Sequence, residues 1–192
     1  SYLFGSIKPY TSSAGNARPL YYYGEFGLSY LLANNFWLTG SYVYERQEPF
    51  ETIARNEHRV FQQLTHILPL NRFNIKQRLR FDERFIENIN TDQFEFSHRL
   101  RYLLGTTYDL SDEFYLMSYT EFFFNTMAGA HFKFNENWSA FQLGYKFNPK
   151  NAIELGYLYV GWIYNNPNDW FNQHYLQATW VNRIDFKRRK EL

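Results

Sequence analysis

The chain has 192 residues, of which 45% are hydrophobic and 22% aromatic, and its 20 basic residues nearly balance 19 acidic ones. A net charge of +1 offers no general field to recruit nucleic acid, and the lack of cysteine excludes disulfides and thiolate metal sites. The mean hydropathy of -0.55, without an apolar run of about 18 residues, excludes a helical membrane protein. It leaves open a membrane β-barrel, whose strands alternate in polarity.

Segments of alternating polarity follow one another along the chain, as expected for β-strands. The clearest lies at residues 73–85, where Phe81 stands between Arg80 and Asp82. We predict ten strands, at residues 2–8, 20–31, 36–45, 57–68, 73–85, 94–104, 114–125, 137–147, 153–163 and 170–181. Residues 132–137 resemble residues 145–150, and a further short strand there would alter the count, which ranges from eight to twelve.

Short breaks rich in turn-forming residues alternate with longer breaks. The short ones lie at residues 33–35, 69–72, 111–113 and 148–151, and the longer ones at residues 10–19, 46–56, 86–92, 126–136 and 164–169. This alternation is typical of outer-membrane barrels, which have short periplasmic turns and longer outer loops. The sequence therefore predicts an all-β fold, with a single antiparallel transmembrane β-barrel at residues 1–182 and a basic C-terminal tail at residues 183–192.

The alternation alone fits two environments, because a soluble barrel carrier would place the same apolar face inside. Three features favour the membrane. Strands of about ten residues suit a tilted crossing of a bilayer, and aromatic residues such as Trp37, Tyr44, Trp138 and Trp170 gather near the strand ends, as in interfacial girdles. The polar face is also more highly charged than an ordinary solvated surface. A soluble carrier of an apolar ligand is kept as an alternative.

The polar face carries basic and acidic residues in nearly equal number. In a barrel of about ten strands, side chains nearly fill the interior, and buried charges must be paired. We therefore predict a charge-paired plug, with selection of a small anion, binding of a peptide plug, or a solvated sheet face as alternatives. The predicted lumen charge network comprises Glu57, Arg59, Arg78, Arg80, Asp82, Arg99, Arg101 and Glu121.

Polar side chains also occur on the lipid-facing side of four consecutive predicted strands, where a charge at mid-membrane costs about 2 to 4 kcal/mol. One interpretation is that another protein covers these side chains, and the other is that they lie at the membrane rim. The candidate partner-facing seam comprises Gln62, Gln77, His98, Ser118 and Thr120.

The sequence offers no catalytic or metal-binding motif. Its five histidines do not form a His-x-x-x-His or His-Glu-x-x-His pattern, and no Gly-x-Ser-x-Gly elbow is present. Ser97 and His98 are adjacent, so on a strand they point to opposite faces and cannot act as a dyad. We therefore assign no catalytic residue, no metal and no cofactor. An outer-membrane enzyme acting on lipid or peptide at the loop end is the second functional class.

Several short runs carry a resemblance to a known family. They are residues 57–63 (EHRVFQQ), 78–85 (RLRFDERF), 98–102 (HRLRY), 119–125 (YTEFFFN), 143–148 (LGYKFN) and 153–157 (IELGY). In this order and spacing they resemble a family of bacterial outer-membrane barrels known only as a domain of unknown function, over about residues 28–181. The resemblance implies a Gram-negative outer-membrane barrel and supplies no activity.

Together these observations predict a non-enzymatic β-barrel of the bacterial outer membrane, with a charge-plugged lumen, that acts as a structural or accessory subunit of an envelope protein complex. Its expected partners are outer-membrane lipids and other outer-membrane or periplasmic proteins, and not nucleic acid. The chain carries no signal peptide, and we expect that one was removed. A diffusion channel is disfavoured because the predicted lumen is narrow and filled.

Overall fold

The fold is described from a computed structural model of the chain. The structure describes residues 2–7, 10–11, 19–47, 54–126, 131–163 and 169–182. Within these ranges, no helix has the length and apolarity that a membrane span requires. The predicted tail at residues 183–192 lies outside the described residues.

The strands are long, as the alternating segments predict. From β3 onward each strand has between 12 residues (β4) and 17 (β9), more than the usual length of about 5 to 6, whereas β1 has 6 and β2 has 2. The elements are β1 (Tyr2–Ile7), β2 (Tyr10–Thr11), β3 (Pro19–Ala33), β4 (Phe36–Gln47), β5 (Arg55–Leu70), β6 (Phe73–Asn88), β7 (Gln93–Asp109), β8 (Phe114–Thr126), β9 (Phe132–Asn148), β10 (Asn151–Ile163) and β11 (Trp170–Asn182).

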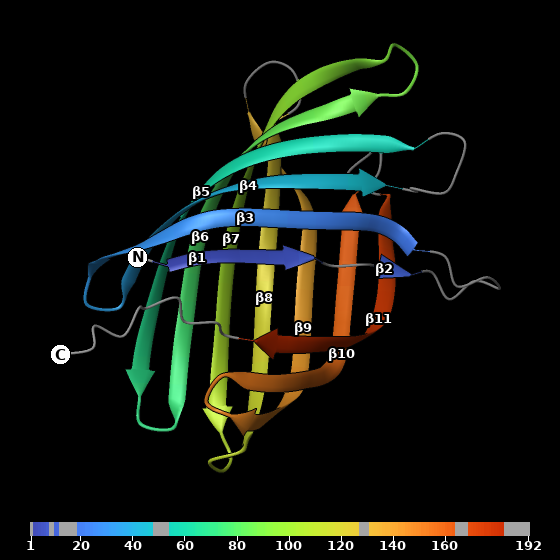
Figure 1. Ribbon diagram of the computed structural model, residues 1–192. Helices are drawn as coiled ribbons and strands as arrows, with labels where there is room; N and C mark the ends of the chain where they lie inside the picture. The colour runs from blue at the N-terminus through green and yellow to red at the C-terminus, as the bar shows by residue number, and fades with distance from the viewer. Residues whose placement is uncertain are drawn as a thin grey trace. The chain divides into compact units, whose positions relative to one another are not determined.

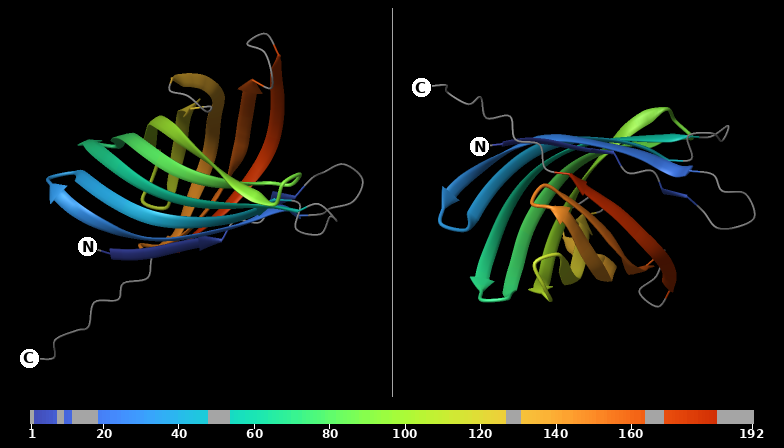
Figure 2. Two further views of the ribbon diagram at one scale, coloured as in Figure 1. Left: turned by 90° about the horizontal axis from the view of Figure 1, so that it is seen from above. Right: turned by 60° about the horizontal axis from the view of Figure 1, so that its bottom comes forward.

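The strands form one sheet in which successive strands are neighbours (Figure 1). Among the described residues, ten strands follow the path β1-β3-β4-β5-β6-β7-β8-β9-β10-β11, and the short β2 pairs with β3 beside this path. Both views of Figure 2 show β3 to β7, in blue to green, side by side in this order. The pairs β3–β4, β4–β5 and β10–β11 are antiparallel, and the short connections from β5 to β10 permit only antiparallel neighbours.

The path has β1 at one end and β11 at the other, and no pairing within the described ranges joins these two strands. The all-β antiparallel sheet is therefore confirmed, and closure of the sheet into a barrel stays a prediction.

Two of the short breaks are tight turns whose residues favour a left-handed backbone. Asn35 has φ 67° and Asn71 has φ 54°, and both follow the ends of strands at positions predicted as turns. Asparagine and aspartate adopt this conformation more readily than other non-glycine residues. Asp92, with φ 53°, ends the turn between β6 and β7 in the same way.

Most strands are longer than predicted, and three differences bear on the connections between them. The break at residues 86–92 is shorter than expected, because β6 continues to Asn88 and the ring of Phe85 packs on Phe96 of β7 at 5.0 Å. The connection at residues 89–92 is thus as short as that at residues 110–113, and the strict alternation of short and long connections fails here. The run at residues 132–137 is the beginning of β9 and not a separate strand. Strand β2 lies within the predicted break at residues 10–19.

The chain divides into two compact units. The first comprises Ser1–Ile67, Lys76–Leu103 and Phe122–Glu136, and the second comprises Leu68–Ile75, Leu104–Glu121 and Asn137–Leu192. The second unit has a small apolar core of Ala140, Leu158 and Val160, against which partly buried aromatic side chains pack.

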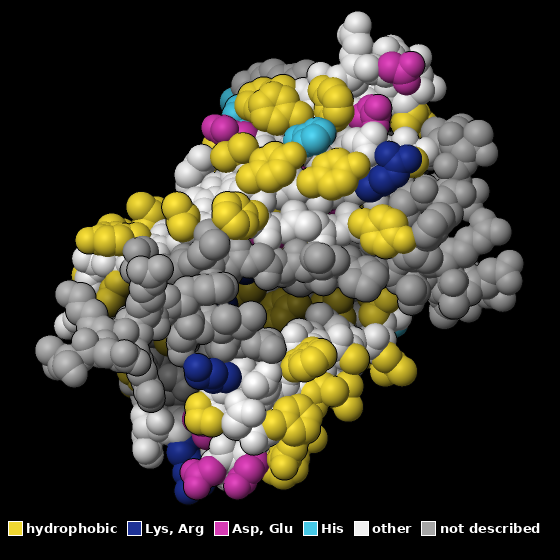
Figure 3. Space-filling model, viewed as in Figure 1, with side chains coloured by type: hydrophobic (Ala, Val, Ile, Leu, Met, Phe, Trp, Pro, Cys, Tyr) yellow, Lys and Arg dark blue, Asp and Glu magenta, His cyan; other side chains and the backbone are white. Residues whose placement is uncertain are grey.

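The first unit shows the reverse of the usual distribution of polarity. Its buried side chains include Glu57, Arg80 and Asp82, which are 1%, 4% and 0% exposed, whereas Phe26 and Leu28 are about 60% exposed, at 59% and 61%. Along each strand the two sets alternate, so one face of the sheet is buried and charged and the other is exposed and apolar. Figure 3 shows such exposed hydrophobic side chains gathered on the visible face, with histidine among them.

Candidate functional site

A buried carboxylate shared by two arginines forms the centre of the charged face in the first unit. Glu57 on β5 accepts hydrogen bonds from Arg59 Nε at 2.9 Å and Nη2 at 2.6 Å. It also receives Arg84 of β6 in a two-pronged arrangement, with Nε on Oε1 and Nη2 on Oε2, both at 2.7 Å. Glu45 lies directly opposite Glu57, and Arg59 bridges these like charges through a 3.4 Å contact with Glu45. The two-pronged contact of Arg84 with Glu57, a fork, is the strongest geometry for a guanidinium and a carboxylate.

A second carboxylate, Asp82 on β6, also lies between two arginines. Arg80 Nε donates to Asp82 Oδ1 at 2.5 Å, and Arg101 Nη1 of β7 lies 4.0 Å from Oδ2. The guanidinium of Arg80 stacks on the ring of Phe61, 3.4 Å from its centroid, and that of Arg101 lies 4.5 Å from the ring centroid of Phe123. The rings cover the buried cations and add cation–π attraction.

The predicted lumen charge network is therefore only partly one cluster. The structure brings together Glu57, Arg59, Arg80, Asp82 and Arg101 on the buried face of the first unit. The remaining members lie elsewhere or are less buried: Arg78 and Arg99 are half-buried in the same unit, and Glu121 is buried in the second unit.

Sequence reasoning missed the aromatic members of this face. Phe61 and Phe123 are each 1% exposed and stand two residues after Arg59 and Glu121, so their position in the alternation places them on the charged face. If aromatic residues are assigned to the lipid-facing side because of their residue type alone, these two are overlooked. Their position in the alternation of side chains along the strand identifies them.

In the second unit, a buried tyrosine ring fits against a glycine. Tyr115 of β8 is 8% exposed and donates its hydroxyl proton to Glu154 Oε1 of β10 at 2.6 Å. Its ring covers Gly144 of β9, where an added Cβ would lie 2.1 Å from the ring. Lys146 lies 5.3 Å from the ring centroid and pairs with Asp109 at 2.8 Å. A glycine at residue 144 thus makes room for the ring that satisfies a buried carboxylate.

We expect Gly144→Ala to destabilise the protein by about 1 to 3 kcal/mol, because the added methyl displaces the Tyr115 ring and weakens its hydrogen bond to buried Glu154. The midpoint of urea unfolding in detergent, followed by tryptophan fluorescence, measures this effect. The matched control is Gly40→Ala, since no atom lies within 4 Å of a Cβ added there. Equal midpoints for the two variants would contradict the packing argument.

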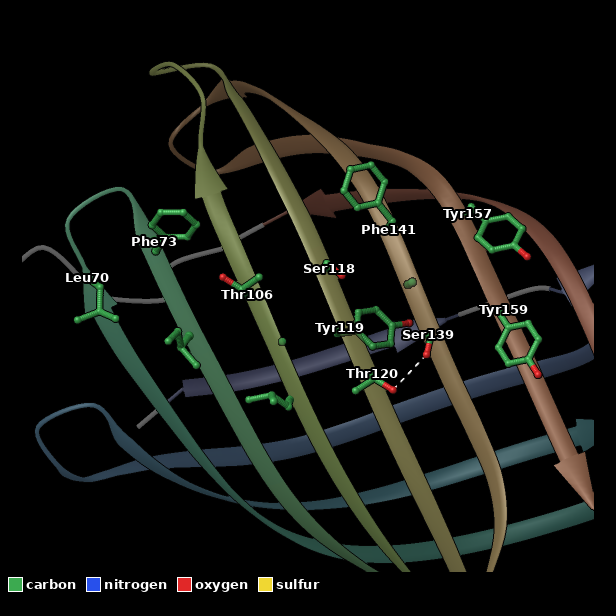
Figure 4. A pocket seen from close by; sticks show the side chains of 14 residues that line it. Leu70, Phe73, Thr106, Ser118, Tyr119, Thr120, Ser139, Phe141, Tyr157 and Tyr159 are labelled. Atoms are coloured by element: carbon green, nitrogen blue, oxygen red, sulfur yellow. Dashed lines mark hydrogen bonds between the residues drawn. The ribbon is translucent and has the colours of Figure 1, made fainter.

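The second unit also carries a groove of about 730 Å³ on its outward face. Figure 4 shows Leu70 and Phe73 along one side of the groove and Phe141, Tyr157 and Tyr159 along the other. Between them lie hydroxyl side chains, including Thr106, Ser118, Thr120 and Ser139, and the hydroxyls of the last two are 3.1 Å apart. The volume is in the range of ligand pockets, about 300 to 1,000 Å³.

The residues of the candidate partner-facing seam are distributed over both units. Gln62 and Gln77 are exposed in the first unit, where His98 is half-buried between the rings of Phe81 and Phe96 at 5.1 and 4.6 Å. The structure places the other two members, Ser118 and Thr120, in the groove of the second unit.

Four of the described histidines, His58, His66, His98 and His174, contact aromatic rings, and two of these also meet a hydroxyl group. Nδ1 of His58 and Nδ1 of His174 each meet a tyrosine hydroxyl, and His66 stacks on Phe36 with ring centroids 4.1 Å apart. In the part of the chain that the structure describes, no group of three or more His, Cys, Asp or Glu side chains is arranged to hold a metal ion.

In its order of antiparallel strands the fold resembles that of a solved porin barrel. The structure described as "NanC porin structure in rhombohedral crystal form" matches with a TM-score of 0.58 and 13% sequence identity, over 95% of this chain and 92% of that chain. At this identity the likeness concerns the fold alone. The chain belongs to the family described as "Protein of unknown function (DUF2490)", whose profile matches residues 7–172. No curated protein matches the sequence.

Proposed function

We propose that the protein is a non-enzymatic β-barrel of the bacterial outer membrane, with a charge-plugged interior, that serves as a structural or accessory subunit of an envelope complex. The observation that carries this proposal is the inverted polarity of the first unit, where charges are buried and large apolar side chains are exposed. Water would penalise such a surface, since soluble monomers rarely expose apolar patches beyond a few hundred Å². A bilayer would favour it.

The charged face supports a filled interior. Both carboxylate oxygens of Glu57 accept hydrogen bonds from arginine, and Asp82 accepts one from Arg80 and lies 4.0 Å from Arg101. The rings of Phe61 and Phe123 occupy further space on the same face. Side chains fixed by such contacts would have to be displaced for a solute to pass, which supports a plug over an open pore.

The experiment that tests the membrane proposal is refolding of the urea-denatured chain with and without phospholipid vesicles. We expect the vesicle sample to acquire β-structure by circular dichroism, resistance to added protease and a heat-dependent shift in gel mobility. In buffer alone we expect aggregation. A chain that folds in buffer as a stable monomer and does not associate with vesicles would contradict the proposal and favour the soluble carrier.

The outward groove supports a subunit role, because its hydroxyl groups lie on a face that is otherwise apolar. We expect the native protein, extracted in mild detergent, to have the mass of a stoichiometric assembly, and Ser118→Trp, which fills the groove, to reduce that mass to one chain. The control is Leu28→Trp on the exposed face of the first unit. A wild-type mass of one chain by light scattering would contradict the subunit role and leave the membrane proposal intact.

A further inference from the structure

One constellation of side chains occurs twice in the chain. In the first unit, Tyr42 and Tyr44 of β4 face Asn56 and His58 of β5. In the second unit, the same residue types recur in the same order on another hairpin. They are Tyr157, Tyr159, Asn172 and His174 on β10 and β11. Both copies thus read Tyr-x-Tyr on one strand and Asn-x-His on the next.

The geometry of the two copies agrees as well as their sequence. Tyr44 pairs directly with His58 in the sheet, and Tyr159 pairs directly with His174. The ring centroids of these pairs are 5.3 and 5.6 Å apart. The first tyrosine of each copy reaches past its direct neighbour toward the histidine, with centroid distances of 6.1 and 5.9 Å.

The hydrogen bonds of the two copies are also the same. The hydroxyl of Tyr42 meets Nδ1 of His58 at 2.6 Å, and the hydroxyl of Tyr157 meets Nδ1 of His174. The second tyrosines donate to asparagine, Tyr44 to Asn56 Oδ1 at 2.8 Å and Tyr159 to Asn172 Oδ1 at 2.5 Å. When a phenol donates to Nδ1, the neutral imidazole carries its proton on Nε2. We assign this tautomer to His58 and His174, so that each copy presents a ring N–H donor.

Toward the end of the hairpin, an N–H donor bonds to a member of each cluster. Arg46 Nη1 donates to Asn56 at 3.0 Å in the first copy, and Trp170 Nε1 donates to the Tyr159 hydroxyl at 3.1 Å in the second. On the other side of each histidine, the same outward face is apolar. Val60 is 39% exposed and Leu176 is 95% exposed, each two residues after the histidine. The single side-chain N–H of Trp170 is used in this bond, whereas the guanidinium of Arg46 has further N–H groups. The face thus changes from aliphatic to aromatic to polar along the hairpin.

We propose that these two Tyr-x-Tyr/Asn-x-His clusters bind the phosphate groups of membrane phospholipids. The groups of a phospholipid match this order. Its acyl chains fit the aliphatic part of the face, and its phosphate oxygens, which carry negative charge, accept hydrogen bonds from the polar part. The amphipathic rings of tyrosine and tryptophan are favoured at the level of the headgroups. The inference rests on the proposed membrane location and adds a ligand class for a defined part of the outer wall.

The test is retention of lipid by the chain in mixed micelles, measured by native mass spectrometry, with dioleoyl phosphatidic acid as the probe. Dioleoylglycerol, which has the same chains without phosphate, is the comparison lipid. We expect the wild type to retain phosphatidic acid in preference to dioleoylglycerol. His58→Phe and His174→Phe should each weaken one site about tenfold, since each removes a hydrogen bond to a charged group. The double variant should bind the two lipids equally.

The matched control is His66→Phe. His66 is also on β5 and stacks on an aromatic ring, Phe36, so the substitution is the same but lies outside both clusters. Tyr42→Phe and Tyr157→Phe retain the rings and remove the hydroxyls, and they should weaken retention even if the histidine variants fold poorly.

Three results would overturn the inference. They are unchanged retention in the double variant, equal retention of dioleoylglycerol by the wild type, and displacement of the lipid by excess inorganic phosphate, which would indicate a site for a free anion. Failure of the membrane proposal has a different signature, since the chain would then fold in buffer and not enter vesicles. A chain that enters vesicles without preferring phosphatidic acid would refute this inference alone.

Discussion

Replacement of Glu57 by glutamine is expected to destabilise the protein by about 3 to 5 kcal/mol, the range typical for removing one partner of a buried ion pair. The Glu57 side chain is 1% exposed and accepts hydrogen bonds from both Arg59 and Arg84. Glutamine has the same shape, but it lacks the charge and offers an NH₂ group where an acceptor is required. The free energy of unfolding in lipid vesicles, obtained from urea titration, measures the loss.

Two further variants separate charge pairing from side-chain shape. Glu95→Gln changes an exposed carboxylate on β7 that accepts a hydrogen bond from Asn88 at 2.6 Å, and we expect a change below about 1 kcal/mol. The double variant Glu57→Gln/Arg84→Gln should recover part of the lost stability, because it removes one of the cations left unpaired. A loss below about 1 kcal/mol for Glu57→Gln would mean that water screens this face, which would contradict a filled interior.

An arginine in place of Leu79 should cost about 2 to 4 kcal/mol, the cost of a cation at the middle of the lipid-facing wall of a barrel. Leu79 lies near the centre of β6 and is 49% exposed, between the inward-facing Arg78 and Arg80. If the exposed face met water, the same substitution would be neutral. Unfolding of the vesicle-bound protein in urea distinguishes the two cases.

Leu79→Ala is the control for this experiment, since it removes the leucine contacts without adding a charge. The difference between the arginine and alanine variants reports the cost of the charge. If both variants lose the same stability, the exposed face of β6 is not in contact with lipid, and the proposed location would be wrong for this part of the sheet.

The strand pattern of this protein was largely readable from its sequence. Alternation along residues 73–85 placed Arg80 and Asp82 on one face and Leu79 on the other, and the structure agrees. Turn-forming residues marked Asn35 and Asn71, which adopt positive φ. Both signals are local, since side chains alternate by steric necessity and few residue types accept a left-handed backbone.

The pairing of particular side chains was not readable in the same way. Glu57 meets Arg84 across 27 residues, and which arginine forms the fork depends on the register between β5 and β6. The fit of Tyr115 on Gly144 likewise depends on the three-dimensional approach of β8 and β9. The repeated Tyr-x-Tyr and Asn-x-His runs were visible in the sequence, but their significance required the cross-strand pairing of Tyr44 with His58.

The sharing of each carboxylate between arginines also has a consequence for the order of folding. The pairs Glu57–Arg59 and Arg80–Asp82 form within β5 and within β6, and the two hydrogen bonds from Arg84 to Glu57 join these strands. At the proposed membrane location, a lone β6 would carry Arg84 into the bilayer without its carboxylate, at a cost of several kcal/mol. We therefore expect β5 and β6 to enter the membrane together, as a prepaired hairpin.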